Sequence, residues 1–314
     1  MLSITVTNIV DELLSYFLQD VDNYELFVKF YETRYPWLWQ KQFSNCQRIG
    51  LNIKRCINEI SNHLAISPKT FNNISRICLE ESDEVKNSVV NKYNDCFDAN
   101  VKVYIYIDLN CGAGWATQSK QTYLVLIGVK SLIDLGFNTR NTIKKILFHE
   151  FGHIVSWMYR NKIEEIESLE QKDYDPIYML YSEGLAQRIA YDFLKSNCWF
   201  QPKKWYYWCE RNFENLAQEY FQRMLNNRSV DDFFNIMLSY KDKTQTGYFI
   251  GLKFINYLEN KYSIEEITKL ELSDVEKHIF NFLLKNSQHR RKHGVCGSLR
   301  STKCLSELRK HRYR

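Results

Sequence analysis

Residues 149–153 read His-Glu-Phe-Gly-His, in which two histidines four residues apart enclose a glutamate. On an α-helix, such residues lie about one turn apart on the same face, so the rings of His149 and His153 can reach one metal ion. Glu150 projects beside them, where its carboxylate can take a proton from a metal-bound water. Together with Zn²⁺, these groups can hydrolyse an amide bond. The pattern therefore predicts a hydrolytic zinc site.

The surrounding sequence must form the helix that this spacing requires. Apolar residues recur near helical intervals through the motif, namely Ile143, Ile146, Leu147, Ile154 and Trp157. Just upstream, four side chains offer oxygens for a helix N-cap: Asn138, Thr139, Asn141 and Thr142. We therefore expect a helix with one buried face. The alternative is that both histidines are hydrogen-bonded core residues without a ligand role.

A catalytic zinc takes three protein ligands, so one more must come from elsewhere in the chain. Position 159 is Tyr, which excludes the metzincin arrangement with a third histidine six residues after His153. We expect a glutamate instead, and Glu183 lies in an apolar segment, 178–194, that predicts an amphipathic helix. An ordinary acid near a helix N-terminus is the alternative. Four other acids lie in a charged run typical of a solvated surface: Glu164, Glu165, Glu167 and Glu170.

The residues after Glu183 bear on how its helix packs. Gly184 and Ala186 are small, so this helix can approach the metal-binding helix closely. Gln187 lies one turn after Glu183 and can accept a hydrogen bond from a ligand histidine, which would fix its tautomer. A surface glutamine explains Gln187 equally well.

Three short motifs resemble those of a known family. They are His-Glu-Phe-Gly-His, the run Glu-Gly-Leu-Ala at 183–186, and Gly-Tyr-Phe-Ile-Gly at 247–251. They resemble motifs of the gluzincin metallopeptidases, and more narrowly of the YjaZ-like family of predicted zinc-dependent proteases, over residues 100–260. The resemblance implies a hydrolase that binds one Zn²⁺ per chain through His149, His153 and Glu183. It implies Glu150 as the general base and a peptide or protein as the substrate, without naming one.

A tyrosine is the candidate for stabilising charge on the substrate. The carbonyl under attack becomes negative and needs a hydrogen-bond donor. Tyr248 lies between two glycines at the start of a predicted amphipathic helix, and we expect it to be that donor; Arg188 is a weaker candidate. Because the chain has 21 tyrosines, a core position explains Tyr248 at least as well.

Two β-rich segments predict strands near the motif helix. Residues 101–107 alternate in polarity, residues 121–129 are largely apolar, and a glycine loop lies between them. Gluzincins bind extended peptides along an edge strand through main-chain hydrogen bonds. We expect Trp115–Thr117 to form that edge. A plain turn between core strands is the alternative.

Composition bounds the fold. The chain is 45% hydrophobic with only 4 Pro and 11 Gly among 314 residues, which indicates a large core and long regular elements. We predict an α+β, mainly helical protein: a gluzincin-type catalytic domain with a small sheet beside the motif helix. Residues 1–98 are expected to be a helical region packed on the catalytic part. Residues 99–284 are expected to be the zinc metallopeptidase domain, and 285–314 a basic tail.

The expected location is the cytoplasm. The N-terminus has no basic start followed by an unbroken apolar run, so it does not resemble a secretory signal. No stretch approaches 18 apolar residues without charge, so we expect no membrane span. Nine cysteines without C-x-x-C spacing favour reduced thiols over a disulfide framework.

The tail leaves other functions open. Residues 285–314 carry a net charge of +9, so the rest of the chain carries −4. We favour a disordered or adventitious extension over a nucleic-acid-binding segment, because no folded basic motif is present. Two alternative functions remain. One is a regulatory, ImmA-like protease that cuts a single repressor, although no helix-turn-helix module is evident. The other is a non-catalytic, zinc-stabilised scaffold whose tail binds nucleic acid.

Overall fold

The computed structural model describes residues 1–17, 23–48, 50–110, 112–119, 121–160, 175–195, 198–236 and 238–287. It divides into two compact units, residues 1–154 and 155–314, which are described one at a time. Helix α7 (Arg140–Arg160) carries the His-Glu-Phe-Gly-His motif and contains the division between them. The predicted domains at 1–98, 99–284 and 285–314 stay a prediction. The tail falls almost entirely outside the described residues, which end at 287.

The first unit contains a four-stranded sheet with the order β1-β2-β4-β3. Strands β1, β2 and β4 are parallel, whereas β3 pairs antiparallel with β4 and forms one edge. Apolar side chains that alternate along β2, such as Val101, Val103 and Ile105, are buried in the core. The strand bounds are β1 Leu2–Asn8, β2 Ala99–Tyr106, β3 Gly114–Ser119 and β4 Thr122–Gly128.

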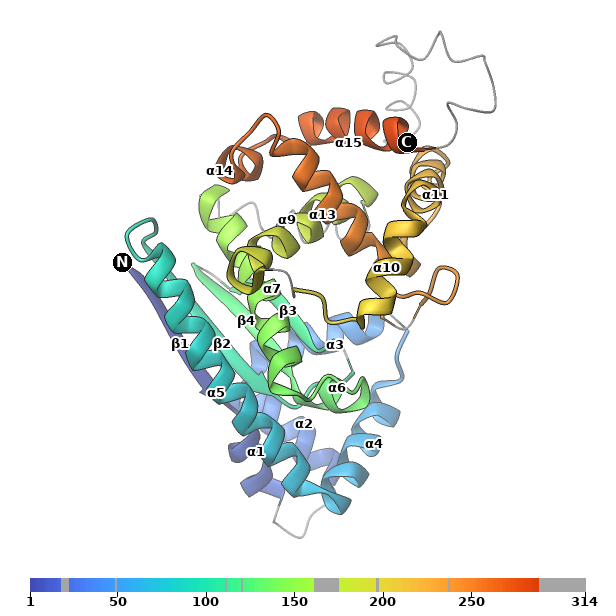
Figure 1. Ribbon diagram of the computed structural model, residues 1–314. Helices are drawn as coiled ribbons and strands as arrows, with labels where there is room; N and C mark the ends of the chain where they lie inside the picture. Colours follow the sequence, from blue (N-terminus) through green and yellow to red (C-terminus); the bar gives the residue numbers. More distant parts are fainter. Residues whose placement is uncertain are drawn as a thin grey trace. The chain divides into compact units, whose positions relative to one another are not determined.

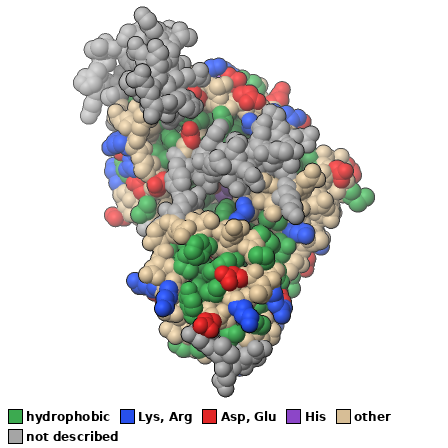
Figure 2. All heavy atoms as spheres, turned by 180° about the vertical axis from the view of Figure 1, so that it is seen from behind, with side chains coloured by type: hydrophobic (Ala, Val, Ile, Leu, Met, Phe, Trp, Pro, Cys, Tyr) green, Lys and Arg blue, Asp and Glu red, His purple; other side chains and the backbone are tan. Residues whose placement is uncertain are grey.

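Helices cover both faces of this sheet. Helices α5 and α7 lie on one face, and α2 and α3 lie on the other (Figure 1). Hydrophobic side chains gather on the back of this unit, the side that is turned away in Figure 1 (Figure 2). The helices of the unit that precede α7 are α1 Val10–Phe17, α2 Asn23–Arg34, α3 Pro36–Arg48, α4 Ile53–Ile66, α5 Pro68–Tyr93 and α6 Val129–Asp134.

The expectation that residues 1–98 are helical is correct for most of this segment but wrong for β1. Strand β1 alternates apolar and polar residues, with Leu2 and Ile4 buried. It pairs in parallel with β2, whose first residue lies far along the chain at Ala99. The local sequence does not reveal that partner. The alternation itself is typical of a half-buried strand, so residues 2–8 carried a strand signal that the helical prediction overlooked.

The second unit is helical in its described part. Helices α9 and α13 pack against each other at its centre, and aromatic and aliphatic side chains surround them in one core cluster. The expected helices at Glu183 and at Tyr248 are therefore confirmed. The helices after α7 are α9 Pro176–Leu194, α10 Lys203–Arg211, α11 Phe213–Leu225, α12 Asp231–Phe234, α13 Thr246–Leu258, α14 Ile264–Thr268 and α15 Leu272–Asn286.

The architecture agrees with the predicted class in its coarse features. It is mainly helical with one small sheet, and the motif helix lies beside that sheet. Among the helices of the described residues, none combines the length and apolar character that a bilayer crossing needs.

Candidate metal centre

The motif helix forms because its ends and its buried face are both satisfied. The hydroxyl of Thr139 accepts a hydrogen bond from the backbone N–H of Thr142 at 3.3 Å, so one of the predicted caps is present. Ile143, Leu147 and Phe151 follow at intervals of four residues and are fully buried. Burial of each such side chain stabilises the fold by about 1.5–3 kcal/mol. The histidine-bearing turns are therefore fixed by the core beneath them.

Ion pairs hold the start of α7 against α5. Glu81 is a buried acid, and it accepts a hydrogen bond from the guanidinium of Arg140 at 3.0 Å. The ammonium of Lys144 lies 3.3 Å from the same carboxylate and 2.7 Å from that of Glu84. Because Glu81 is buried, removal of its cationic partners would leave an uncompensated charge. The pairing therefore sets the position of α7 along the sheet.

The motif side chains are enclosed. His149, Glu150 and His153 are 3%, 7% and 9% exposed, which is low for ionisable residues. The two imidazole centroids lie 5.0 Å apart with the rings nearly perpendicular. The two histidines therefore share one face of α7, as their spacing predicts.

The edge strand approaches Glu150 at its first residue. A β-carbon built on Gly114 would fall 2.6 Å from Oε1 of Glu150 and 2.6 Å from Cγ2 of Ile146. Such separations are too short for a real β-carbon, so a side chain at residue 114 would force Glu150, Ile146 or the strand to shift. The backbone of the edge strand thus lies directly against the proposed base. The predicted edge strand around Trp115–Thr117 is confirmed, since β3 lies at one edge of the sheet.

A buried carboxylate anchors the loop that leads into this strand. Asp108 is fully buried, and it accepts hydrogen bonds from the backbone N–H of Ser131 at 3.0 Å and from the Ser131 hydroxyl. The Ser131 hydroxyl oxygen accepts a hydrogen bond from the N–H of Gly112 at 3.4 Å. The N–H of Gly128 donates to the carbonyl of Ala113 at 3.1 Å. The loop is therefore tied to the sheet just before Gly114.

A lysine holds the edge strand from the opposite face. Lys41 on α3 donates a hydrogen bond to the hydroxyl of Thr117, which is fully buried. Its ammonium lies 5.5 Å from the centre of the Trp115 ring. Sequence analysis missed Lys41 and Asp108. Asp108 comes directly after a predicted strand, a position that could have marked it, whereas nothing local marks Lys41.

Glu183 lies in the second turn of a well-capped helix. The carboxylate of Asp175 accepts hydrogen bonds from the N–H groups of Ile177 and Tyr178, at 2.7 and 3.3 Å. At Gly184, an added β-carbon would lie 2.5 Å from the carbonyl oxygen of Gly251 on α13. The close approach that Gly184 permits is thus with α13, whereas we had expected it with the motif helix.

The three predicted metal ligands come together. One ligand atom each from His149, His153 and Glu183 lies within 4.8 Å of the others, and the two histidines are buried while Glu183 is half-buried. Two imidazole nitrogens and a carboxylate oxygen are an established donor set for catalytic zinc, which leaves a further coordination position open. The residues present therefore match the chemistry of Zn²⁺. The rival acids Glu164, Glu165, Glu167 and Glu170 lie outside the described residues.

Tyr248 lies near the start of α13, as expected. Its half-buried ring packs on Phe234 and Phe200, with centroid distances of 6.0 and 6.3 Å. The preceding Gly247 is wedged against the Phe234 ring, since a β-carbon there would lie 2.5 Å from Cε1. Its position is therefore fixed by packing, and its role in catalysis stays a prediction.

The two other residues singled out near Glu183 have structural partners. Gln187 is fully buried, so the alternative of a surface glutamine is wrong, and its amide donates to the carbonyl of Cys198 at 3.0 Å. Arg188 donates to the carboxylates of Glu259, at 2.8 Å, and Asp192. Because two carboxylates already hold its guanidinium, Arg188 is poorly placed to bind a substrate.

Comparison with known proteins adds no family: no protein-family model, curated protein or solved structure matches this chain.

Proposed function

We propose that this protein is a zinc-dependent peptidase, which cleaves peptide bonds with an activated water. The proposal is supported chiefly by one observation: the ligand atoms of His149, His153 and Glu183 lie within reach of one ion. Glu150 is buried on the same helix. A separate helix that supplies a glutamate ligand is the gluzincin arrangement, so we place the chain among proteins of that kind as part of the same proposal.

One Zn²⁺ per chain would be held by His149, His153 and Glu183. When bound, zinc acts as a Lewis acid that makes water acidic near neutral pH and polarises a carbonyl group. The two histidines must be neutral to serve as ligands, so acid should weaken the site.

Glu150 acts as the general base. Its carboxylate takes a proton from the attacking water and passes it to the nitrogen of the leaving amine. Because Glu150 is buried, its interaction with the reacting groups is weakly screened by solvent. The absence of a side chain at Gly114 lets the backbone of the edge strand lie directly against this carboxylate.

The edge strand β3 binds the substrate as an extended chain. The side of β3 away from β4 offers main-chain N–H and C=O groups, which recognise any peptide backbone without regard to sequence. The anchors at Asp108, Ser131 and Lys41 keep this strand in place before the substrate arrives, which lowers the entropy lost on binding. Tyr248 is the hydrogen-bond donor that we propose for the developing oxyanion.

Turnover of a quenched-fluorescent peptide library tests this function. The zinc-loaded protein should cleave some members of the library, and Glu150→Gln should lower the rate by at least about a hundredfold while zinc stays bound. Glu59→Gln is the matched control, since Glu59 is an exposed acid paired with Arg55 one turn away. Equal rates for Glu150→Gln and the wild type would refute the proposal.

A further inference from the structure

The outer face of α10 carries an open pocket. It encloses about 380 Å³ and is lined by Lys204, Tyr207, Glu210 and Arg211. The last three follow Lys204 by three, six and seven positions, so all four side chains share one side of the helix. The opposite side carries Trp205 and Cys209, which are buried in the core. Helix α10 therefore presents these four side chains together on the side away from the core.

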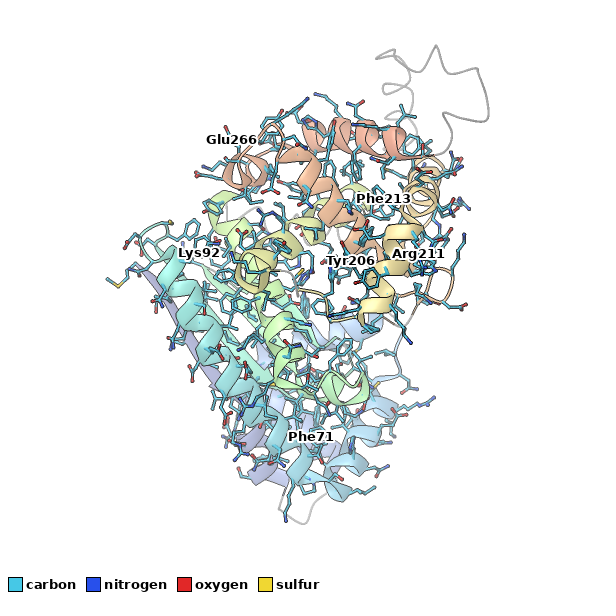
Figure 3. All side chains as sticks on the ribbon, in the orientation of Figure 1. Phe71, Lys92, Tyr206, Arg211, Phe213 and Glu266 are labelled. Carbon is cyan, nitrogen blue, oxygen red and sulfur yellow. The ribbon has the colours of Figure 1, made fainter. Side chains whose placement is uncertain are left out.

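Tyr207 is unusual for an aromatic residue because its side chain is 59% exposed. Its neighbour Tyr206 leaves the helix in another direction from Arg211 (Figure 3) and packs on Phe249 with a centroid distance of 5.8 Å. The rings of Tyr206 and Tyr207 meet edge to face at 5.9 Å. One broad face of the Tyr207 ring thus remains available for stacking against a planar group.

Glu210 is an ionised acceptor in this pocket. Its Oε1 accepts a hydrogen bond from the hydroxyl of Tyr206 at 2.6 Å and pairs with the ammonium of Lys253 at 2.8 Å. Burial opposes ionisation, but the bonds from Lys253 and Tyr206 outweigh it and hold the pKa of Glu210 below its usual range. The carboxylate can therefore accept hydroxyl groups of a ligand.

The two remaining lining residues are cations at opposite ends of the pocket. Lys204 and Arg211 are exposed, and in the described part of the chain neither is paired with an acid. Seven residues of helix separate them by about 10 Å along the axis. Because Lys253 neutralises Glu210, the pocket keeps an excess of positive charge that attracts an anionic group.

We propose that this pocket binds a nucleoside monophosphate. The base stacks on Tyr207, the ribose hydroxyls donate to the carboxylate of Glu210, and the phosphate pairs with Arg211, which follows Glu210 in the chain. A volume of about 380 Å³ lies within the range of small-molecule sites and suits one base with its sugar and phosphate. A purely acidic ligand would gain nothing from Tyr207 and would be repelled by Glu210. This site does not depend on the proposed peptidase activity.

Calorimetric titration of the full-length protein with AMP, adenosine and inorganic phosphate tests this inference. AMP should bind more tightly than either fragment, because only AMP engages the aromatic, acidic and basic groups together. Tyr207→Ala and Arg211→Ala should each weaken AMP binding by roughly tenfold. The matched controls are Tyr191→Ala and Arg228→Ala, which remove an exposed tyrosine and an exposed arginine outside the pocket.

Glu210→Gln provides a second, independent measurement. It should weaken binding of AMP but leave binding of 2′,3′-dideoxy-AMP unchanged, since the latter lacks the hydroxyls that Glu210 accepts. Thermal unfolding of each variant checks that the fold is kept. The proposal is overturned if AMP does not bind at millimolar concentration, if phosphate alone binds as tightly as AMP, or if the pocket variants behave like the controls.

Discussion

The first residue of the edge strand, Gly114, lies so close to Glu150 that a β-carbon at this position would fall 2.6 Å from Oε1 of that carboxylate. Glu150 lies on the motif helix and Gly114 on the strand, so the contact joins the proposed base to the proposed substrate strand. A side chain at residue 114 would therefore disturb the position of Glu150.

Gly114→Ala should impair catalysis without loss of metal. The new methyl group must displace Glu150, the strand or Ile146, and a shift of about 1 Å in a catalytic group can lower kcat/KM roughly a hundredfold. Zinc content should be unchanged, because neither histidine contacts the new methyl directly. Ser119→Ala, at the other end of the same strand, is the control. Wild-type kcat/KM in Gly114→Ala would show that the contact has no catalytic importance.

Gly184→Ala should destabilise the second unit. Its β-carbon would lie 2.5 Å from the carbonyl oxygen of Gly251, so α9 and α13 must separate. Overpacking of this kind lowers the free energy of unfolding by about 1–3 kcal/mol. Urea denaturation measures it. Asn256→Ala on the exposed face of α13 is the control, and an equal midpoint for the two variants would contradict the close packing of these helices.

Thiol chemistry should distinguish buried from exposed cysteines. Burial raises the pKa of Cys209 to about 12, and it also raises that of Cys78 well above its usual value. A raised pKa means that the reactive thiolate is nearly absent at pH 8. Iodoacetamide followed by peptide mass mapping should therefore modify exposed Cys96 first, and should modify Cys78 and Cys209 only after denaturation. Equal labelling rates for Cys96, Cys78 and Cys209 in the folded protein would show that the last two are not buried.

Local patterns predicted the elements that carry the candidate site. The helix around His149, the helices at Glu183 and Tyr248, and the strands β2 and β4 all follow from periodicities within a short window. The pairing of β1 with β2 and the packing of Gly184 do not, because each depends on a partner far along the chain: β2 in one case and Gly251 in the other.

The same distinction applies to the residues around the site. His149, Glu150 and His153 are recognisable because one helix fixes their spacing. Glu183 was preferred over the acids of a charged run because it lies in an apolar helical segment, and its carboxylate does lie near the two histidines. The four rival acids lie outside the described residues. The anchors Asp108 and Lys41 were not predicted: the position of Asp108 directly after a strand could have marked it, whereas nothing in the local sequence marks Lys41.

The content of tightly bound zinc tests the central claim most directly. It should be measured by elemental mass spectrometry after dialysis against a weak chelator, for the wild type and for His149→Ala, Glu183→Ala and Glu150→Gln. We predict one zinc per chain in the wild type and in Glu150→Gln, and loss of zinc in the other two variants. A wild-type protein that binds no zinc, or a Glu183→Ala variant that retains it with undiminished affinity, would contradict the account.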